Sequence, residues 1–108
     1  MDKITIFWTQ TAILQRDLIF HYWNIRNKSN FYSKELNLTI RERIEILKSN
    51  PEIGIETTFG KVRSISMGNY RILYLVNDNK IIIMGFWDNR QDPERLLTFL
   101  KDKPQNNI

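Results

Sequence analysis

The feature that most constrains this chain is a change in the spacing of its apolar residues near position 60. Up to residue 49 the apolar side chains recur mainly every three or four positions, as on one face of an α-helix. From Lys61 they alternate with polar side chains, as in a β-strand with one buried face. A helical first half followed by a strand-rich second half predicts an α+β domain, with the helices on one face of a sheet.

The first half is expected to contain one strand and two helices. Residues 3–8 are β-branched and aromatic, which is typical of a short strand, and Thr9 can cap a helix over about 10–27. The apolar surface of that helix is broad and indicates contacts from more than one direction. Its centre is the stripe formed by Leu14, Leu18, Tyr22 and Ile25.

A second helix is expected over about 30–49. Its apolar side chains are spaced by three and four positions, and the polar ones face solvent. The apolar set is Leu36, Ile40, Ile44 and Leu47. Pro51 makes Asn50 a stop for this helix, and residues 49–60 are expected to form a loop.

The second half predicts three strands joined by tight turns, over 61–67, 70–76 and 80–87. Gly68 and Asn69 suit a two-residue hairpin turn, and Asp92 followed by Pro93 predicts a last helix over about 93–101. The predicted order is β-α-α-β-β-β-α. This is a small single α+β domain, with an N-terminal helical hairpin packed on a mostly antiparallel four-stranded sheet.

Length and composition exclude several classes of protein. A chain of 108 residues is one domain with its own core. It has no cysteine and a single histidine, His21, which excludes disulfides, thiolate zinc sites and cysteine nucleophiles. We therefore expect no metal and no cofactor. No apolar run approaches the roughly 18 residues of a membrane span, so we expect a soluble cytoplasmic protein with no membrane partner.

The net charge of +4 is concentrated in the sheet half: residues 1–60 contribute 8 − 7 = +1, and residues 61–108 contribute 8 − 5 = +3. The candidate binding residues of this half are Lys61, Arg63, Arg71 and Arg90. Guanidinium groups suit phosphates and carboxylates, so one hypothesis is a basic sheet face for RNA or an acidic protein segment. Structural salt bridges at strand ends are the alternative, which spacing alone favours.

Other conspicuous residues favour structural roles. His21 has no Ser or Asp placed beside it by a local motif, so packing is favoured over catalysis. Aromatic residues could stack on bases, but core and interhelix packing is the favoured interpretation. These are Trp8, Tyr22, Trp23, Tyr32, Phe86 and Trp87. Residues 87–93 could form a site rim, although a turn and a helix cap explain Asp92 and Pro93.

Four stretches spread over residues 4–97 form an ordered pattern. They are the opening strand and helix ITIFWTQTAILQRDLIFHYW, the link ILKSNPEIG, the hairpin VRSISMGNYRILYLV and the ending IIIMGFWDNRQDPERL. In their order and spacing they resemble the RelE/ParE superfamily, the toxins of bacterial type II toxin–antitoxin modules. The resemblance covers most of the chain and agrees with the element order predicted above.

The resemblance implies a toxin domain over residues 1–101, followed by a polar tail over 102–108. It also implies a cognate antitoxin, a small protein whose acidic C-terminal segment wraps the helices and the sheet. Some members of the superfamily cut mRNA on the ribosome, and others inhibit DNA gyrase. Matching the nuclease motif residue by residue places Arg71 and then Arg90 in the catalytic set, with Lys61 and Arg63 near the positions that grip RNA.

Three hypotheses about function remain at this point. The first is a ribosome-dependent mRNA endoribonuclease, the second a non-enzymatic inhibitor of DNA gyrase, and the third a non-toxic binding relic of the fold. Nuclease members often carry a Tyr or His in the C-terminal segment, and residues 91–108 contain neither. Ser64 and Ser66 occupy strand positions where a general base could stand. The sequence therefore assigns no general acid or base.

Overall fold

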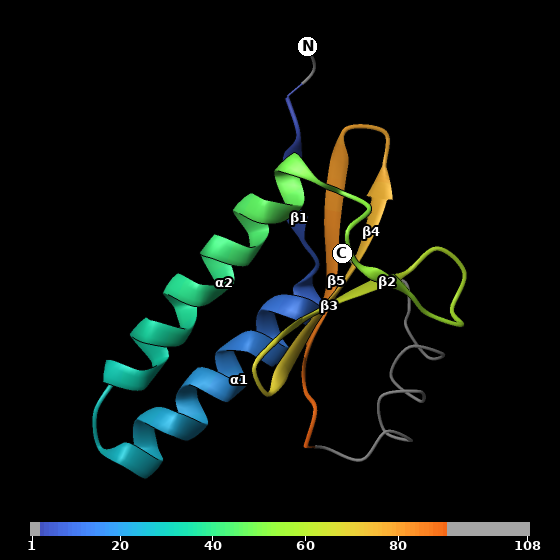
Figure 1. Cartoon of the computed structure of the whole chain (residues 1–108). Coiled ribbons are helices and arrows are strands. Elements are labelled where there is room, and N and C mark those ends of the chain that lie inside the picture. Colours follow the sequence, from blue (N-terminus) through green and yellow to red (C-terminus); the bar gives the residue numbers. More distant parts are fainter. Residues whose placement is uncertain (1–2, 91–108) are drawn as a thin grey trace.

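The computed structural model describes residues 3–90 (Figure 1). The predicted helix over 93–101, the domain boundary at 101 and the tail over 102–108 lie outside the described residues. The elements in chain order are β1 (Thr5–Trp8), α1 (Gln10–Asn27), α2 (Phe31–Ser49), β2 (Ile55–Glu56), β3 (Arg63–Met67), β4 (Tyr70–Asn77) and β5 (Lys80–Asp88).

One mixed sheet runs through the domain in the strand order β1-β5-β4-β3-β2. Strand β1 is parallel to β5, and the other neighbours are antiparallel. The α+β class is confirmed, but the predicted four-stranded sheet is wrong because the 49–60 loop contains a fifth strand, β2. A strand of two residues is too short to show alternation, and β2 exists because Ile55 and Glu56 pair with Ser64 and Arg63 of β3.

Both predicted hairpin turns of the sheet half are present. Gly68 has a φ of +64° in the turn between β3 and β4, as the first position of a two-residue hairpin turn requires. Asp78 has a φ of +57° between β4 and β5, a conformation that aspartate tolerates better than most residues. These turns, together with a register shift between Leu73 and Tyr74 in the β4–β5 pair, place Arg71 opposite Ser66 on one side and Trp87 on the other.

The two helices lie side by side on one face of the sheet (Figure 1). Thr9 caps α1 as predicted: its Oγ1 accepts a hydrogen bond from the Ala12 amide at 3.1 Å and donates one to the Ile83 carbonyl at 3.1 Å. Lys28 ends the helix in the left-handed conformation. The cap therefore fixes the start of α1 against β5. Neither helix within residues 3–90 is long and apolar enough to cross a membrane.

The inward face of α2 is the predicted one. Its side chains pack on buried residues of β4 and β5, which form the core of the domain. The buried set on α2 is Leu36, Ile40, Ile44 and Leu47, and the sheet contributes Tyr70, Ile72, Tyr74, Ile81, Ile83 and Phe86. The three- and four-residue spacing of this helix was therefore a correct guide to its buried face.

The apolar stripe of α1 faces solvent instead of being contacted by the rest of the domain. Its exposed fractions are 58% for Leu14, 58% for Leu18, 54% for Tyr22 and 63% for Ile25. The inward face is formed by the fully buried Ala12, with Ile19 and Phe20 packed partly against the core. The expectation of contacts from more than one direction is therefore wrong for this stripe within residues 3–90.

Candidate functional site

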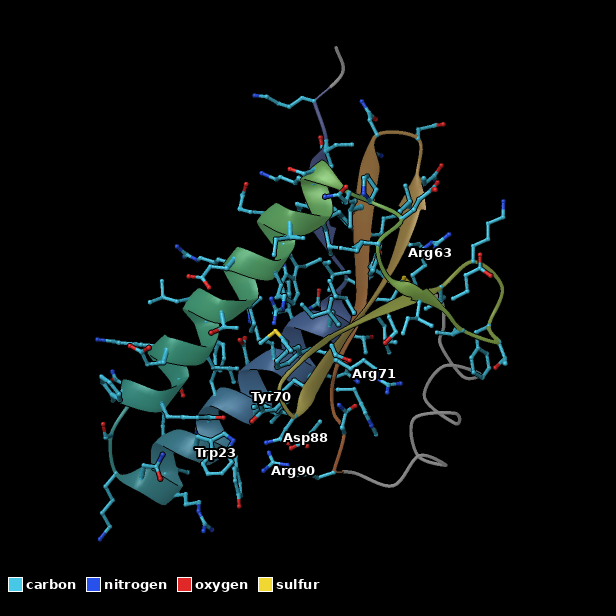
Figure 2. All side chains as sticks on the ribbon, in the orientation of Figure 1. Trp23, Arg63, Tyr70, Arg71, Asp88 and Arg90 are labelled. Atoms are coloured by element: carbon cyan, nitrogen blue, oxygen red, sulfur yellow. The ribbon has the colours of Figure 1, made fainter. Side chains whose placement is uncertain are left out.

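The four basic residues predicted for the site are not all brought together, although Lys61 and Arg63 line the same pocket. Arg63 lies on β3, Arg71 on β4 and Arg90 just after β5, and Figure 2 shows Arg63 well apart from Arg90. Lys61 is exposed before β3 and lines a pocket of about 370 Å³ beside Arg63, with Glu52 and Glu56. Each residue therefore has to be considered in its own surroundings.

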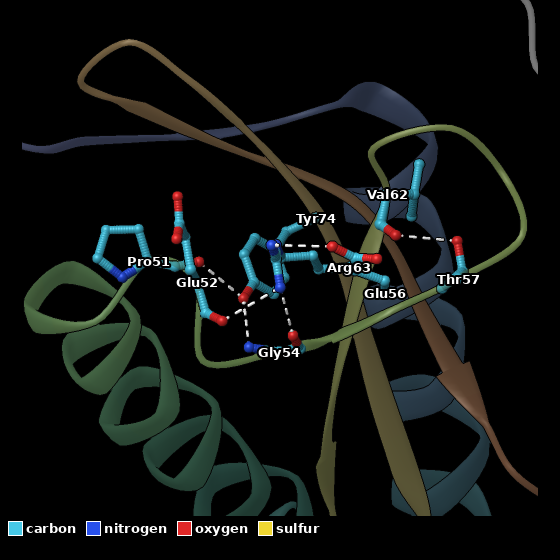
Figure 3. A network of polar contacts seen from close by, with 8 residues as sticks. All are labelled: Pro51, Glu52, Gly54, Glu56, Thr57, Val62, Arg63 and Tyr74. Carbon is cyan, nitrogen blue, oxygen red and sulfur yellow. Dashed lines mark hydrogen bonds and ion pairs between the residues drawn. The ribbon is translucent and has the colours of Figure 1, made fainter.

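Arg63 holds the loop before β3 onto the sheet (Figure 3). Its Nη1 donates to the carbonyl oxygens of Glu52 at 3.1 Å and Gly54 at 2.8 Å, and its Nη2 lies 3.4 Å from the Glu56 carboxylate. A guanidinium used in this way has few donors left for a ligand. The surroundings of Arg63 match the structural salt-bridge alternative.

Tyr74 holds the same loop from the buried side (Figure 3). Its hydroxyl accepts a hydrogen bond from the Gly54 amide at 2.9 Å and donates one to the Pro51 carbonyl at 2.9 Å. Burial raises the pKa of Tyr74, so the hydroxyl keeps its proton at neutral pH and continues to donate. Loop 51–56 is thus fixed by two side chains of the sheet, which reach it from β3 and β4.

Arg71 has different surroundings from Arg63 and Arg90, although Arg43 of α2 also has a buried Nε without a hydrogen-bond partner. It lies on the strand face opposite Tyr70 and Ile72, between Ser66 and Trp87 in the register of the sheet. Its Nε is buried without a hydrogen-bond partner, and it forms no ion pair with residues 3–90. A half-buried cation that is left unpaired is costly to a fold, so Arg71 is a candidate for contact with a ligand.

Arg90 is held by a carboxylate two residues before it. Its Nε and Nη2 donate to Oδ1 and Oδ2 of Asp88 at 2.9 and 2.8 Å, and its backbone amide donates to Oδ1 at 2.9 Å. These bonds hold the pKa of the Asp88 carboxyl below its usual value and raise the pKa of Arg90. Arg90 is therefore permanently charged and fixed in orientation.

Tyr70 connects this ion pair to both helices. Its hydroxyl accepts a hydrogen bond from Trp23 Nε1 at 3.1 Å and lies 3.4 Å from the Tyr32 hydroxyl and 3.5 Å from Arg90 Nη2. Burial, followed by the hydrogen bond with Tyr32, raises the pKa of Tyr70 to about 12. The phenol stays neutral at physiological pH and serves as a hydrogen-bonding centre for the cluster.

A pocket of about 580 Å³ opens between α1 and the end of β5, beside this cluster. Figure 2 labels Trp23, Asp88 and Arg90 of its lining. It is lined by Leu18, Ile19, Tyr22, Trp23, Arg26, Asp88 and Arg90. The guanidinium carbons of Arg26 and Arg90 lie 5.7 and 5.9 Å from the centroid of the Trp23 ring, within cation–π range. The pocket thus combines the Trp23 ring, two guanidinium groups, the Asp88 carboxylate that pairs with Arg90, and apolar side chains.

Sequence reasoning missed Arg26 and Tyr70 as site residues. It placed Asp88 in the candidate rim over 87–93, and for Trp23 it favoured packing over base stacking. Tyr70 was visible in the sequence only as the neighbour of Arg71, and it faces the other side of the strand. Among residues 3–90, no group of acidic or histidine side chains is arranged to hold a metal ion. His21 is exposed on α1.

Replacement of Asp88 by asparagine should lower stability near neutral pH and make it less sensitive to acid. The Asp88 pKa is lower in the folded chain than in the unfolded chain. Its carboxylate therefore stabilises the fold above the unfolded pKa, and this contribution is lost as the pH falls through the folded pKa. In urea unfolding, the wild-type advantage over Asp88→Asn should be full near pH 6 and shrink below about pH 4. An advantage that stays constant into acid contradicts this role of Asp88.

Comparison with known proteins places the chain in a family. Over residues 6–93 the sequence matches the family described as the ParE toxin of the type II toxin–antitoxin system parDE. The chain belongs to the ParE toxin family. The expected membership of the RelE/ParE superfamily is thereby confirmed. The matched range contains Tyr70, Arg71 and Arg90.

A solved structure supports the ParE fold. A chain of the chromosomal ParDE TA system from P. aeruginosa is 16% identical to this one, with a TM-score of 0.68. The alignment covers 80% of this chain and 96% of that chain. At this identity the likeness concerns the fold. No curated protein matches the sequence.

Proposed function

We propose that this ParE-family chain is a growth-inhibiting toxin that acts by binding DNA gyrase in the cytoplasm. A cognate antitoxin with an acidic segment would keep it inactive. The observation that carries the proposal is which of the predicted arginines are bonded within the chain and which is not. Arg63 and Arg90 are engaged in internal bonds, and Arg71 is the predicted arginine left without a bonding partner among residues 3–90.

This arrangement supports binding more than mRNA cleavage, the hypothesis that ranked first on sequence alone. Attack by a ribose 2′-hydroxyl needs a base, an acid and positive charge beside one phosphate. The cross-strand neighbours of Arg71 are Ser66 and Trp87, and the sequence after Arg90 contains no His or Tyr. The Tyr70 phenol has a pKa of about 12, which makes it a poor base at neutral pH.

Arg71 is suited to a contact with a protein target. An arginine that is already partly desolvated loses less hydration on binding, and arginines are enriched among the residues that dominate protein interfaces. A target carboxylate could pair with the Nη groups of Arg71, which reach the surface whereas Nε is buried. We therefore assign Arg71 a role in target binding.

Replacement of Arg71 by alanine should abolish growth inhibition without unfolding the chain. We expect the concentration that half-inhibits gyrase supercoiling to rise by at least about tenfold, and the urea midpoint to be equal or higher because an unpaired buried atom is removed. Arg41→Ala, on the exposed face of α2, is the matched control and should change neither quantity.

Mapping of mRNA 5′ ends after induction separates the two toxin mechanisms. New ends that vanish in Arg71→Ala, with supercoiling unaffected, would establish mRNA cleavage and overturn the gyrase proposal. Normal growth after induction without any antitoxin would overturn both and support the non-toxic relic. If Arg71→Ala lowers the urea midpoint enough to explain its loss of gyrase inhibition, the role of Arg71 is structural.

A further inference from the structure

A second arginine with an orphaned nitrogen lies on α2, where it lines a pocket beside the β3–β4 hairpin. The Nε of Arg43 is buried without a hydrogen-bond partner, and Arg43 forms no ion pair with residues 3–90. The pocket has a volume of about 270 Å³, and Leu36 and Met67 form part of its apolar lining. An unpaired guanidinium beside apolar side chains is suited to pairing with a carboxylate of a partner.

A carboxylate of α2 lines the same pocket. Glu35 is exposed and forms no ion pair with residues 3–90. It precedes Arg43 by eight residues, which corresponds to about 12 Å along the helix axis. The pocket therefore presents a positive and a negative group that do not neutralise each other.

The hydroxyl of Tyr32 gives the pocket a further donor. The Tyr70 hydroxyl is approached by Trp23 Nε1 at 3.1 Å and by Arg90 Nη2 at 3.5 Å, and both of these groups can only donate. The single proton of the Tyr70 hydroxyl is therefore directed to the Tyr32 oxygen, 3.4 Å away. Tyr32 lines the pocket and keeps its own proton for an acceptor that residues 3–90 do not supply.

The charges of the pocket distinguish between kinds of partner. A nucleic acid needs a track of unpaired cations for its phosphates, and Glu35 would repel them. An acidic antitoxin segment would meet the same repulsion from Glu35. A mixed-charge protein surface, with an acidic and a basic side chain about 12 Å apart, complements both Arg43 and Glu35.

This pocket and Arg71 lie on opposite faces of the same hairpin. Tyr70 lines the pocket and packs in the core, whereas Arg71, the next residue of β4, faces the other side of the sheet. The turn residues Gly68 and Asn69 also line the pocket. A partner surface that encloses the end of the hairpin therefore contacts Arg71 on one side and Arg43 on the other.

We propose that the protein target encloses the end of the β3–β4 hairpin and uses this pocket as its second contact, in addition to Arg71. This inference rests on the proposed function, since it takes DNA gyrase as that target. One carboxylate of the target pairs with the Arg43 guanidinium, and one basic side chain pairs with Glu35. The Tyr32 hydroxyl donates a hydrogen bond to an oxygen of the same surface.

Inhibition of gyrase supercoiling by the full chain tests these contacts. Arg43→Gln should raise the half-inhibiting concentration by at least about tenfold. Glu35→Lys should raise it by about fivefold because like charges then face each other, and Tyr32→Phe by about fivefold because one hydrogen bond is lost. The controls are Arg41→Gln and Glu42→Lys, which change exposed residues of α2 outside the pocket and should inhibit like the wild type.

Folding and antitoxin binding supply two further readouts. The urea midpoint of Arg43→Gln should be equal to or above that of the wild type, because a buried unpaired nitrogen is removed. Glu35→Lys changes an exposed side chain and should leave the urea midpoint unchanged. It should also bind the antitoxin encoded beside this chain at least as tightly as the wild type, because the antitoxin segment is expected to be acidic.

The outcomes that overturn the inference are distinguishable from failure of the proposed function. If the wild-type chain does not inhibit supercoiling, the gyrase proposal fails and the inference fails with it. If the wild type inhibits, Arg71→Ala does not, and Arg43→Gln and Glu35→Lys inhibit like the wild type, only the pocket contact is overturned. The contact is also overturned if these two variants weaken antitoxin binding and leave inhibition intact, or if Arg43→Gln loses inhibition through a lower urea midpoint.

Discussion

Replacement of Gly54 by alanine should lower the free energy of unfolding by about 3 kcal/mol. A Cβ at this position would lie 2.5 Å from the Tyr74 hydroxyl oxygen, 2.8 Å from its Cε1 and 3.0 Å from the Ser64 carbonyl oxygen. The Tyr74 ring is fully buried and cannot move aside without disturbing the core. Relief of the clash must therefore lengthen the Gly54–Tyr74 hydrogen bond and lift the loop from the sheet.

Gly60→Ala is the control for this prediction. Gly60 has a φ of +59°, and a Cβ there would meet nothing within 4 Å. The expected loss is about 1 kcal/mol, which comes from the left-handed backbone alone. Urea unfolding of both variants measures the difference. Equal losses in the two variants would mean that the clash with Tyr74 is relieved at no cost, and would contradict the prediction.

The parts of the fold that could be predicted are those specified by local signals. The buried face of α2 was predicted correctly because Ile40 and Ile44 belong to an unbroken apolar row along the helix. The hairpins were correct because Gly68 marks a backbone conformation that few residues adopt. Strand β2 was missed because its two residues become a strand only through pairing with β3, which lies seven or more positions away.

The candidate site was less predictable because its contacts join distant parts of the chain. The sequence could not show that Arg63 is used by loop carbonyls, since the loop reaches it only after β2 and β3 pair. The contact between Trp23 and Tyr70 spans 47 positions and brings α1 beside the Tyr70 hydroxyl, which lies 3.5 Å from Arg90 Nη2. Periodicity indicates which side chains share a face, but it does not indicate which faces meet.

The stripe on α1 shows a further limit of periodicity. Apolar spacing marked Leu14 and Leu18 as the centre of the helix surface, but the structure buries the neighbouring Ala12. Small residues permit close approach between a helix and a sheet, so the buried face of α1 is marked by a small side chain. Large apolar residues left outside such a contact are available for a second partner.

Ala12→Leu should therefore destabilise the chain by about 2 kcal/mol, the cost of inserting extra methylenes into a packed interface. Ala12 is fully buried and lies in the first turn of α1, where its amide donates a hydrogen bond to Thr9 Oγ1. A larger side chain would push α1 away from β5 and strain the bond between Thr9 and Ile83. Urea unfolding measures the loss.

Leu14→Ala is the control for this prediction, because it shortens an exposed side chain on the same helix. The leucine is 58% exposed, so stability should stay within about 0.5 kcal/mol of the wild type. The loss of antitoxin affinity should follow the reverse order. Leu14→Ala should lose more affinity than Ala12→Leu when both are compared at equal concentrations of folded protein. If Leu14→Ala costs as much stability as Ala12→Leu, the stripe is part of the folded core, and the surface available to a partner helix is lost with it.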